Sequence, residues 1–316
     1  MFAEPSRGTL LFVLLMSPLH CEGYADTAKP QLGAATDLGV SAVLQYIRPS
    51  PHPLQLVRDT NGRDSGVPTE EVEPTNVFVH NGRRRDCMVD REGFQLIQST
   101  LTPANVNFLD GMTVVSTYYP DCEALLRSVL GEDVLVKAFD HNVRMAEPSD
   151  DAKIQKPIGL VHGDYTEVSA PRRLMDLAKP PKINDVLRES PLQQSWVDEC
   201  IQNGRRFSLI NVWRSIDRVH AIESDPLACA TVDSVDRSHL RTLQIHYADR
   251  IGENYLVTPS EEHEWVYFPD MTQNEALLIQ QWDSKGDRFS VHSAFGLPEP
   301  GRPRSSIEVR CVCLWP

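Results

Sequence analysis

Short apolar segments separated by turn-forming residues recur along most of the chain, and this pattern limits the possible folds more than any single motif. A run in which apolar and polar residues alternate predicts a half-buried strand, and short apolar runs between turns predict buried ones. The segments predicted as strands are residues 38–47, 77–80, 134–139, 207–213, 228–232, 241–247, 265–268, 276–282, 290–295 and 306–314.

Helical patterns are few. Residues 121–131 combine an expected N-cap at Asp121, apolar residues at helical spacing and a terminal Gly131. Residues 185–202 have helical composition interrupted by Pro191. Because strands do not alternate with helices, a parallel α/β fold is disfavoured, and we predict a mainly β fold with flanking helices, an antiparallel barrel or jelly roll. The sequence has neither a Gly-x-Gly-x-x-Gly after a strand nor a Gly-Lys-Ser/Thr loop, so it contains no motif that indicates a nucleotide cofactor.

Composition bounds the function classes. With 316 residues, 41% hydrophobic and 24% charged, the chain can bury a full core. The formal charge of −13 argues against nonspecific nucleic-acid binding, and no stretch approaches the ~20 apolar residues of a membrane span. We expect an N-terminal extension over residues 1–36, followed by a single catalytic domain over residues 37–316.

The cysteines bear on the compartment. The chain has seven cysteines, an odd number, and no pair has zinc-finger spacing. This pattern is typical of reduced, buried thiols in a cytoplasmic protein. Residues 9–16 are apolar and follow Arg7, as in a short signal peptide, but Glu4 and the weak basic region are not typical of one. The sequence therefore favours the cytoplasm and leaves secretion through residues 1–22 open.

Residues 157–166 carry the motif of most chemical interest, the end of an apolar strand followed by His162-Gly-Asp164. Residues i and i+2 of a strand point to the same side, so the imidazole and the carboxylate can converge. Two histidines and one carboxylate form the face that holds non-haem Fe(II) while leaving positions open. His292, in a distant predicted strand, is the candidate for the third ligand. A lone His-x-Asp is more often a turn with a hydrogen-bonded histidine. The order of His-x-Asp, a distant strand histidine and then an Arg-x-Ser is more specific and leaves both interpretations open.

Twelve residues after His292 stands an Arg-x-Ser, Arg304 and Ser306. A guanidinium fork assisted by a hydroxyl is suited to the far carboxylate of a chelating keto acid. The alternative for Arg304 is a surface cation at the start of a strand. Arg310, at i+6 of the same strand, is the second candidate for the carboxylate.

Three further residues are candidates for the pocket. Arg214 ends an apolar strand, and contact with substrate or keto acid and a structural salt bridge are both open for it. Asn211 is predicted either to cap a turn or to touch substrate. Tyr165, directly after the His-x-Asp, is a candidate pocket residue.

Other histidines offer weaker alternatives. His263 with Glu264, and His246 with Asp249, are possible metal pairs, but each lacks a third partner. For His141 we favour a structural hydrogen bond.

Landmarks through most of the chain resemble the CmcJ/AsaB-like family, which comprises a cephamycin-pathway hydroxylase and fungal hydroxylase/desaturases of secondary-metabolite clusters. The landmarks are Arg-Glu-Gly-Phe at 91–94, Phe-Asp-His at 139–141 with Arg144, Val-His-Gly-Asp at 161–164, Asn-Val-Trp-Arg at 211–214, Asp-Pro-Leu-Ala at 225–228, Met271 with Glu-Ala-Leu-Leu at 275–278, Asp-Ser at 283–284, His292 with Ala-Phe at 294–295, and Arg-Ser-Ser-Ile-Glu-Val-Arg at 304–310. They cover roughly residues 38–314.

The resemblance implies a double-stranded β-helix, a cupin-like jelly roll related to Fe(II)/2-oxoglutarate oxygenases. It implies His162, Asp164 and His292 as metal ligands, Arg304 and Ser306 as the 2-oxoglutarate site, and O2 as the oxidant. Two departures stand out: residues 229–233 lack the early Asp and Arg of the family, and Ser215 replaces a proline after Trp213-Arg214. The first departure concerns the expected substrate pocket.

The function expected on this resemblance is hydroxylation or desaturation of a small-molecule natural product in secondary-metabolite biosynthesis. One alternative is non-redox chemistry on the same fold, as an isomerase or a dehydratase acting on a biosynthetic intermediate. Another is an accessory partner of another pathway enzyme. A homodimer or a pathway-enzyme partner is compatible with the sequence.

Overall fold

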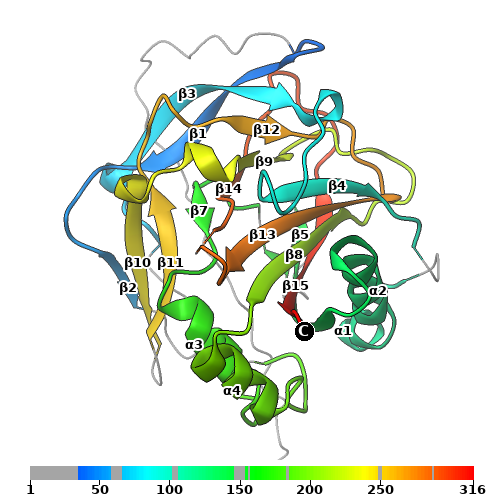
Figure 1. The fold of residues 1–316 in the computed structure, drawn as a ribbon. Coiled ribbons are helices and arrows are strands. Elements are labelled where there is room, and N and C mark those ends of the chain that lie inside the picture. Colours follow the sequence, from blue (N-terminus) through cyan, green and yellow to red (C-terminus); the bar gives the residue numbers. More distant parts are fainter. Residues whose placement is uncertain are drawn as a thin grey trace, which may run out of the picture.

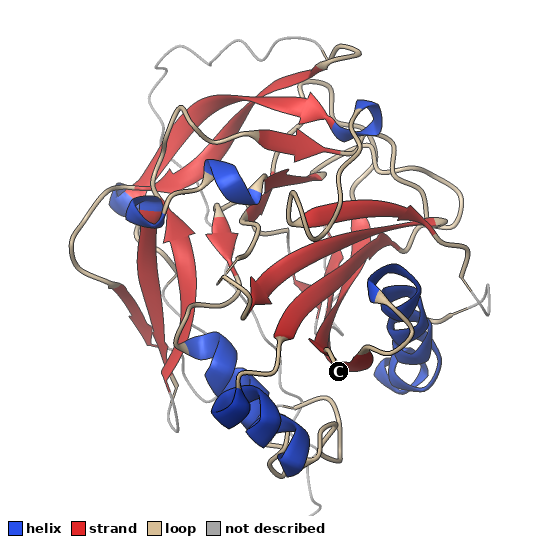
Figure 2. Ribbon diagram, in the orientation of Figure 1, coloured by secondary structure: helices blue, strands red, loops and turns tan. Residues whose placement is uncertain are grey.

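Two β-sheets that pack against each other make up most of the fold, with the helices packed outside them (Figure 1, Figure 2). The computed structural model describes residues 35–57, 66–101, 106–145, 154–155, 157–182, 185–247, 251–286 and 288–316. The predicted extension over residues 1–36 therefore lies almost wholly outside the described residues. The same holds for the secretion signal considered for residues 1–22.

The larger sheet has nine strands and carries both candidate histidine ligands. In spatial order its strands are β1 (Gly39–Ile47), β3 (Val72–Asn81), β12 (Trp265–Tyr267), β9 (Leu227–Ala230), β14 (His292–Ala294), β7 (His162–Gly163), β11 (Ile251–Val257), β10 (Leu240–His246) and β2 (Leu54–Val57).

The smaller sheet has six strands. Their order is β4 (Phe94–Gln98), β13 (Glu275–Asp283), β8 (Phe207–Ser215), β15 (Ser305–Leu314), β5 (Leu135–Met145) and β6 (Ile154–Gln155). Antiparallel pairing dominates both sheets, and the parallel pairs among the described strands are β10–β2, β12–β3 and β5–β6. The predicted mainly β, jelly-roll fold with flanking helices is confirmed.

The helices lie outside the sheets. They are α1 (Gly111–Thr113), the π-helix Val114–Tyr118, α2 (Tyr119–Leu130), α3 (Ser169–Asp176) and α4 (Gln194–Asn203), with short 3-10 helices at Thr69–Glu71, Gly82–Arg84, Val232–Ser234 and Arg237–His239.

The predicted N-cap of the first long helix was wrong. The backbone N–H of Met112 donates to the Asp110 side chain at 3.2 Å, so the helical segment begins near Asp110 and Asp121 lies inside it. Its predicted end is confirmed, because Gly131 follows α2 with a φ of 122°, a conformation that favours glycine.

Strand β8 shows how the sequence assigns the two faces of the smaller sheet. Ile210 and Val212 pack in the same apolar cluster as Leu126 of α2, on the face that this helix covers (Figure 1). Because successive residues of a strand alternate sides, Asn211 and Trp213 point to the opposite face, between the two sheets. Both are buried there. This interior face positions the candidate site.

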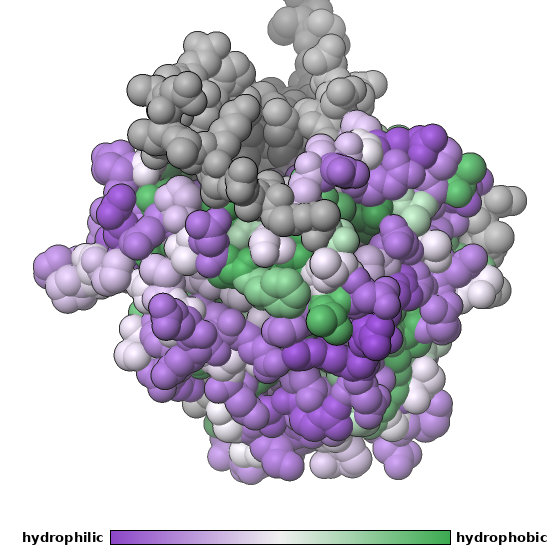
Figure 3. All heavy atoms as spheres, turned by 90° about the horizontal axis from the view of Figure 1, so that it is seen from above, coloured by the Kyte–Doolittle hydropathy of each residue, from purple (hydrophilic) through white to green (hydrophobic). Residues whose placement is uncertain are grey.

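The described surface is mixed in polarity, and the described cysteines lie inside the fold. In the view of Figure 3 most described residues are hydrophilic, and hydrophobic ones gather near the centre of that face. Among the described helices, none combines the length and the hydrophobicity that a membrane span requires. The six described cysteines are buried and free, which agrees with the prediction of reduced thiols.

Candidate metal centre

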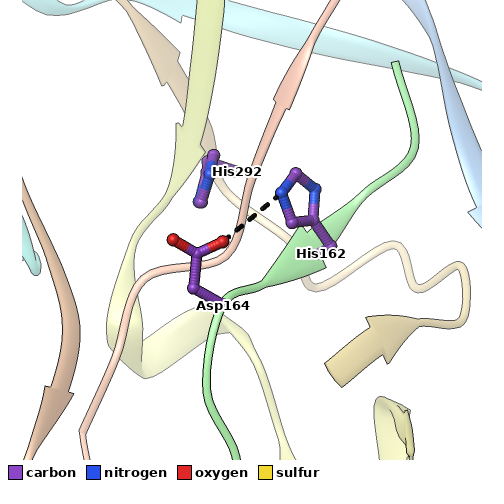
Figure 4. A group of neighbouring side chains, drawn as sticks. All are labelled: His162, Asp164 and His292. Atoms are coloured by element: carbon purple, nitrogen blue, oxygen red, sulfur yellow. Dashed lines mark ion pairs between the residues drawn. The ribbon is translucent and has the colours of Figure 1, made fainter. Parts of the chain in front are cut away.

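His162, Asp164 and His292 converge between the sheets, and each offers a ligand atom within 4.8 Å of the other two (Figure 4). His162 Nε2 lies 3.7 Å from Asp164 Oδ1. No other group of three His, Cys, Asp or Glu side chains comes this close within the part of the chain that the structure describes. The geometry therefore brings together the residues of the predicted 2-His-1-carboxylate face.

Strand pairing explains this convergence. His162 and His292 are direct partners in the antiparallel pair β7–β14, and their ring centroids are 4.5 Å apart. Asp164 follows His162 by two residues and so lies on the same side of the chain. Residues far apart in the sequence thus meet because β14 inserts between β7 and β9.

The protonation states suit a divalent cation. Burial, followed by the charge of His292, lowers the pKa of His162 to about 4, and burial also lowers the pKa of His292. Burial acts to raise the pKa of Asp164, but Arg310 and the two histidines outweigh it and hold that pKa below its usual value. At neutral pH the donors are two neutral imidazoles and one carboxylate, the set that non-haem Fe(II) takes.

One hydrogen bond selects the tautomer of His162. Its Nδ1 lies 2.7 Å from the carbonyl oxygen of Leu160, so Nδ1 carries the proton and donates it. The lone pair of Nε2 is then left for a metal ion, and the ring is fixed in direction.

The Asp164 carboxylate is held from the smaller sheet. Asn211 Nδ2 donates to Asp164 Oδ2 at 2.9 Å, and Arg310 Nε donates to the same oxygen at 3.4 Å. Oδ1, the oxygen nearer His162, takes part in neither bond. The structure thus gives Asn211 a contact with Asp164 that neither of its predicted roles included.

Arg310 has three carboxylate partners, which favours orienting Asp164 over the predicted contact with a keto acid. Besides Asp164 it contacts Asp140 at 2.9 Å and Glu308 at 3.3 Å. A bulge after Arg310 breaks the register of β15 against β5. The i+6 spacing from Arg304 could not reveal these partners.

Arg304 and Ser306 are buried and incompletely paired. Arg304 donates through Nη1 to the carbonyl of Asp225, and its guanidinium lies 5.4 Å from the ring centroid of Trp213. Arg304 Nε and Ser306 Oγ have no hydrogen-bond partner among the described residues. Burial lowers the pKa of Arg304 to about 9, so it is still cationic at neutral pH. The alternative of a surface cation is wrong, because Arg304 is only 2% exposed.

Arg214 points away from the centre, which supports its structural alternative. It follows Asn211 by three residues in β8 and so faces α2. Its guanidinium donates to the carbonyl of Gln273 at 2.6 Å, to the hydroxyl of Ser99 at 2.8 Å and to that of Tyr118 at 3.1 Å. The predicted contact of Arg214 with substrate or keto acid is corrected, because protein groups already occupy its donors.

Tyr165 is half-buried and packs against the core between the sheets. Burial raises the pKa of its hydroxyl to about 12, and the charge of Arg310 acts in the opposite direction. The role of Tyr165 as a pocket residue stays a prediction.

Of the two alternative metal pairs, the one at His263 and Glu264 does not assemble. His263 lies 3.0 Å from the Tyr46 hydroxyl and 3.1 Å from His239 Nδ1, whereas Glu264 pairs with Arg85. Asp249, the partner proposed for His246, lies outside the described residues. His141 lies 2.9 Å from the Tyr119 hydroxyl, which is a structural hydrogen bond as predicted.

Sequence comparison decides the family. Residues 44–314 match the family described as "Oxidoreductase/YMDC permease-like domain". The chain belongs to this family. It is 28% identical over 266 residues to the hydroxylase/desaturase efuI of Hormonema carpetanum, covering 77% of this chain and 84% of that protein. It is 26% identical over 285 residues to the alpha-ketoglutarate-dependent dioxygenase phiK of a fungal species, and the match covers 87% of this chain and 96% of that protein.

A solved structure shares the fold of this family member. The iron and alpha-ketoglutarate-dependent endoperoxidase NvfI superposes with a TM-score of 0.71 over 89% of this chain and 99% of that one, at 20% sequence identity. At this identity the match shows the shared fold.

Proposed function

We propose that this family member is a non-haem Fe(II)/2-oxoglutarate-dependent oxygenase that hydroxylates or desaturates a small-molecule natural product. One observation carries the proposal: a buried face of two neutral histidines and a carboxylate shares an interior with unpaired donors at Arg304 and Ser306. The names of efuI and phiK support the same class of reaction. Residues 37–316 would form its single catalytic domain.

Fe(II) would be held by His162 Nε2, by Asp164 and by His292. With 2-oxoglutarate and O2, the bound iron would supply the oxidation of an unreactive C–H bond. The Leu160 carbonyl keeps the His162 lone pair directed at the centre, and Asn211 and Arg310 keep the Asp164 carboxylate ionised and oriented. These contacts fix the ligands before any metal arrives.

Arg304 and Ser306 would bind the far carboxylate of 2-oxoglutarate. Both side chains are buried, so a bound carboxylate would be shielded from water and its hydrogen bonds strengthened. Trp213 supports the guanidinium from one side. The interior connects this pair with the triad, because Trp213 and Asn211 project from the same face of β8 and Asn211 contacts Asp164.

Conversion of 2-oxoglutarate to succinate by the purified protein tests the proposal. We expect slow succinate formation that requires both Fe(II) and O2 and accelerates with the correct natural product. Turnover of a biosynthetic intermediate at the same rate without O2 would favour the isomerase or dehydratase alternative. Activity that appears only with a second pathway protein would favour the accessory role.

We propose a cytoplasmic location on the strength of the six buried, free cysteines. A homodimer or a complex with another pathway enzyme stays a prediction from the sequence.

A further inference from the structure

A β-bulge in β13 places Gln281 beside the centre. In the pairing of β13 with β8, Gln280 lies opposite Ile210 and Trp282 opposite Leu209, so Gln281 has no partner across the strands. A bulge of this kind redirects a side chain out of the regular alternation. Gln281 is fully buried, and no feature of the sequence singled it out.

The Gln281 amide is oriented by the backbone of a metal-ligand residue. The N–H of Asp164 donates to Gln281 Oε1 at 3.3 Å, which fixes the oxygen end of the amide. The other end, Nε2, has no hydrogen-bond partner among the described residues. The neighbouring Gln280 differs, because its Nε2 donates to Asp283 Oδ2 at 3.1 Å.

A buried N–H donor without a partner is costly, so its retention beside Asp164 points to an acceptor that arrives with a ligand. The amide contacts the backbone of Asp164, so Nε2 lies close to one residue of the three-residue centre. An anionic oxygen is the strongest acceptor for such a donor.

We propose that Gln281 is a binding residue of this centre, donating from Nε2 to a carboxylate oxygen of the keto acid bound there. This inference rests on the proposed function. It adds a contact to the end of the keto acid near the triad, whereas Arg304 and Ser306 would hold the far carboxylate.

Two substitutions separate the donor from the acceptor of the amide. Gln281→Glu retains an oxygen for the Asp164 N–H and removes the donor, and Gln281→Met removes both without adding charge. Gln280→Met is the matched control, a buried amide in the same strand whose donor bonds Asp283. Each variant is checked for folding by circular dichroism and thermal unfolding.

The readouts are the dissociation constants of Fe(II) and of 2-oxoglutarate, measured anaerobically. We expect both Gln281 variants to bind 2-oxoglutarate about tenfold more weakly, with Fe(II) binding unchanged, and the Gln280 variant to match the wild type. Unchanged 2-oxoglutarate binding in either folded Gln281 variant would overturn the inference. So would an equal loss of Fe(II) affinity, because that would mean Gln281 only supports Asp164.

The wild-type titration separates this inference from the proposed function. If the wild-type protein binds Fe(II) but not 2-oxoglutarate, the proposed function fails and the role of Gln281 fails with it. If the wild type binds both and the Gln281 variants do so equally well, only the role of Gln281 fails.

Discussion

Asp164 receives hydrogen bonds from two strands of the smaller sheet, through Asn211 in β8 and Arg310 in β15. Both partners use Oδ2 and leave Oδ1 facing His162. At the scale of single residues, the contacts of Asn211 and Arg310 decide whether the Asp164 carboxylate has a fixed direction. Partners of this kind typically change metal affinity by about 10- to 100-fold when they are removed.

Replacement of Asn211 by alanine tests that contact. We expect Asn211→Ala to weaken Fe(II) binding by about 10- to 100-fold, because the Asp164 carboxylate loses its shortest hydrogen bond. Anaerobic equilibrium titration with Fe(II) measures the effect. The control is Asn76→Ala in β3, an exposed asparagine of the other sheet that should bind Fe(II) as the wild type does. Equal affinity in all three proteins would contradict the role of Asn211.

Arg304 and Arg214 are both buried, yet the structure assigns them different tasks. Arg304→Gln should abolish measurable 2-oxoglutarate binding with a smaller loss of stability. Arg214→Gln should lower the free energy of unfolding by about 1–3 kcal/mol and leave 2-oxoglutarate affinity unchanged, because it leaves the buried polar groups of Ser99, Tyr118 and Gln273 without their partner. Urea unfolding and 2-oxoglutarate titration of both variants distinguish the tasks, and a reversed pattern would refute the assignment.

Buried histidines predict how the stability of the metal-free protein depends on pH. Burial lowers the pKa of His162 and of His263 to about 4, whereas an exposed histidine titrates near 6.5. Between these values the unfolded chain binds more protons, so the free energy of unfolding should decrease as the pH falls from about 6.5 to 4.

Urea unfolding at pH 7.5 and pH 5 measures this decrease, and His263→Gln should make it smaller while retaining a polar partner for Tyr46. An identical decrease in the variant would argue against a neutral, partly buried His263.

At the scale of secondary-structure elements, most strands follow from alternation because each buries a defined face. The predicted segments 207–213, 276–282 and 306–314 became β8, β13 and β15 with nearly the same ends. Strand β11 and helix α3 were not predicted. Strand β11 carries Gly252, Glu253 and Asn254 among its apolar residues, and α3 is only eight residues long with a proline in its first turn.

The bulge at Gln281 and the direction of Arg214 escaped prediction for another reason. Both depend on register between distant strands, which the local sequence does not contain.

Helix α2 contributes to stability through the face that covers the smaller sheet. Leu126 is fully buried there, among residues of β5, β8 and β15. We expect Leu126→Ala to lower the free energy of unfolding by about 2–5 kcal/mol, from lost burial and the cavity it leaves. Leu109→Ala, at an exposed leucine before the helix, should change it by less than about 0.5 kcal/mol. Chemical denaturation of both variants measures the difference, and similar values would contradict this packing.

At the scale of the whole molecule, the jelly roll matters because it brings distant segments to one interior. The sequence indicated His162 and Asp164 as a pair because they are two residues apart. From the sequence, His292 and Arg304 could only be suggested as partners of this pair, because the order of strands in both sheets decides whether they come near it. The resemblance to a known family supplied that order, and the structure brings His292 to the pair and leaves Arg304 and Ser306 with unpaired atoms.

The most direct test is an anaerobic titration of the metal-free protein with Fe(II) and then 2-oxoglutarate, followed by visible absorption. We expect the weak charge-transfer band of an iron-chelated keto acid in the wild type and its loss in His292→Ala, which lacks one ligand of the centre. A folded wild-type protein that binds Fe(II) but develops no band with 2-oxoglutarate would contradict the account.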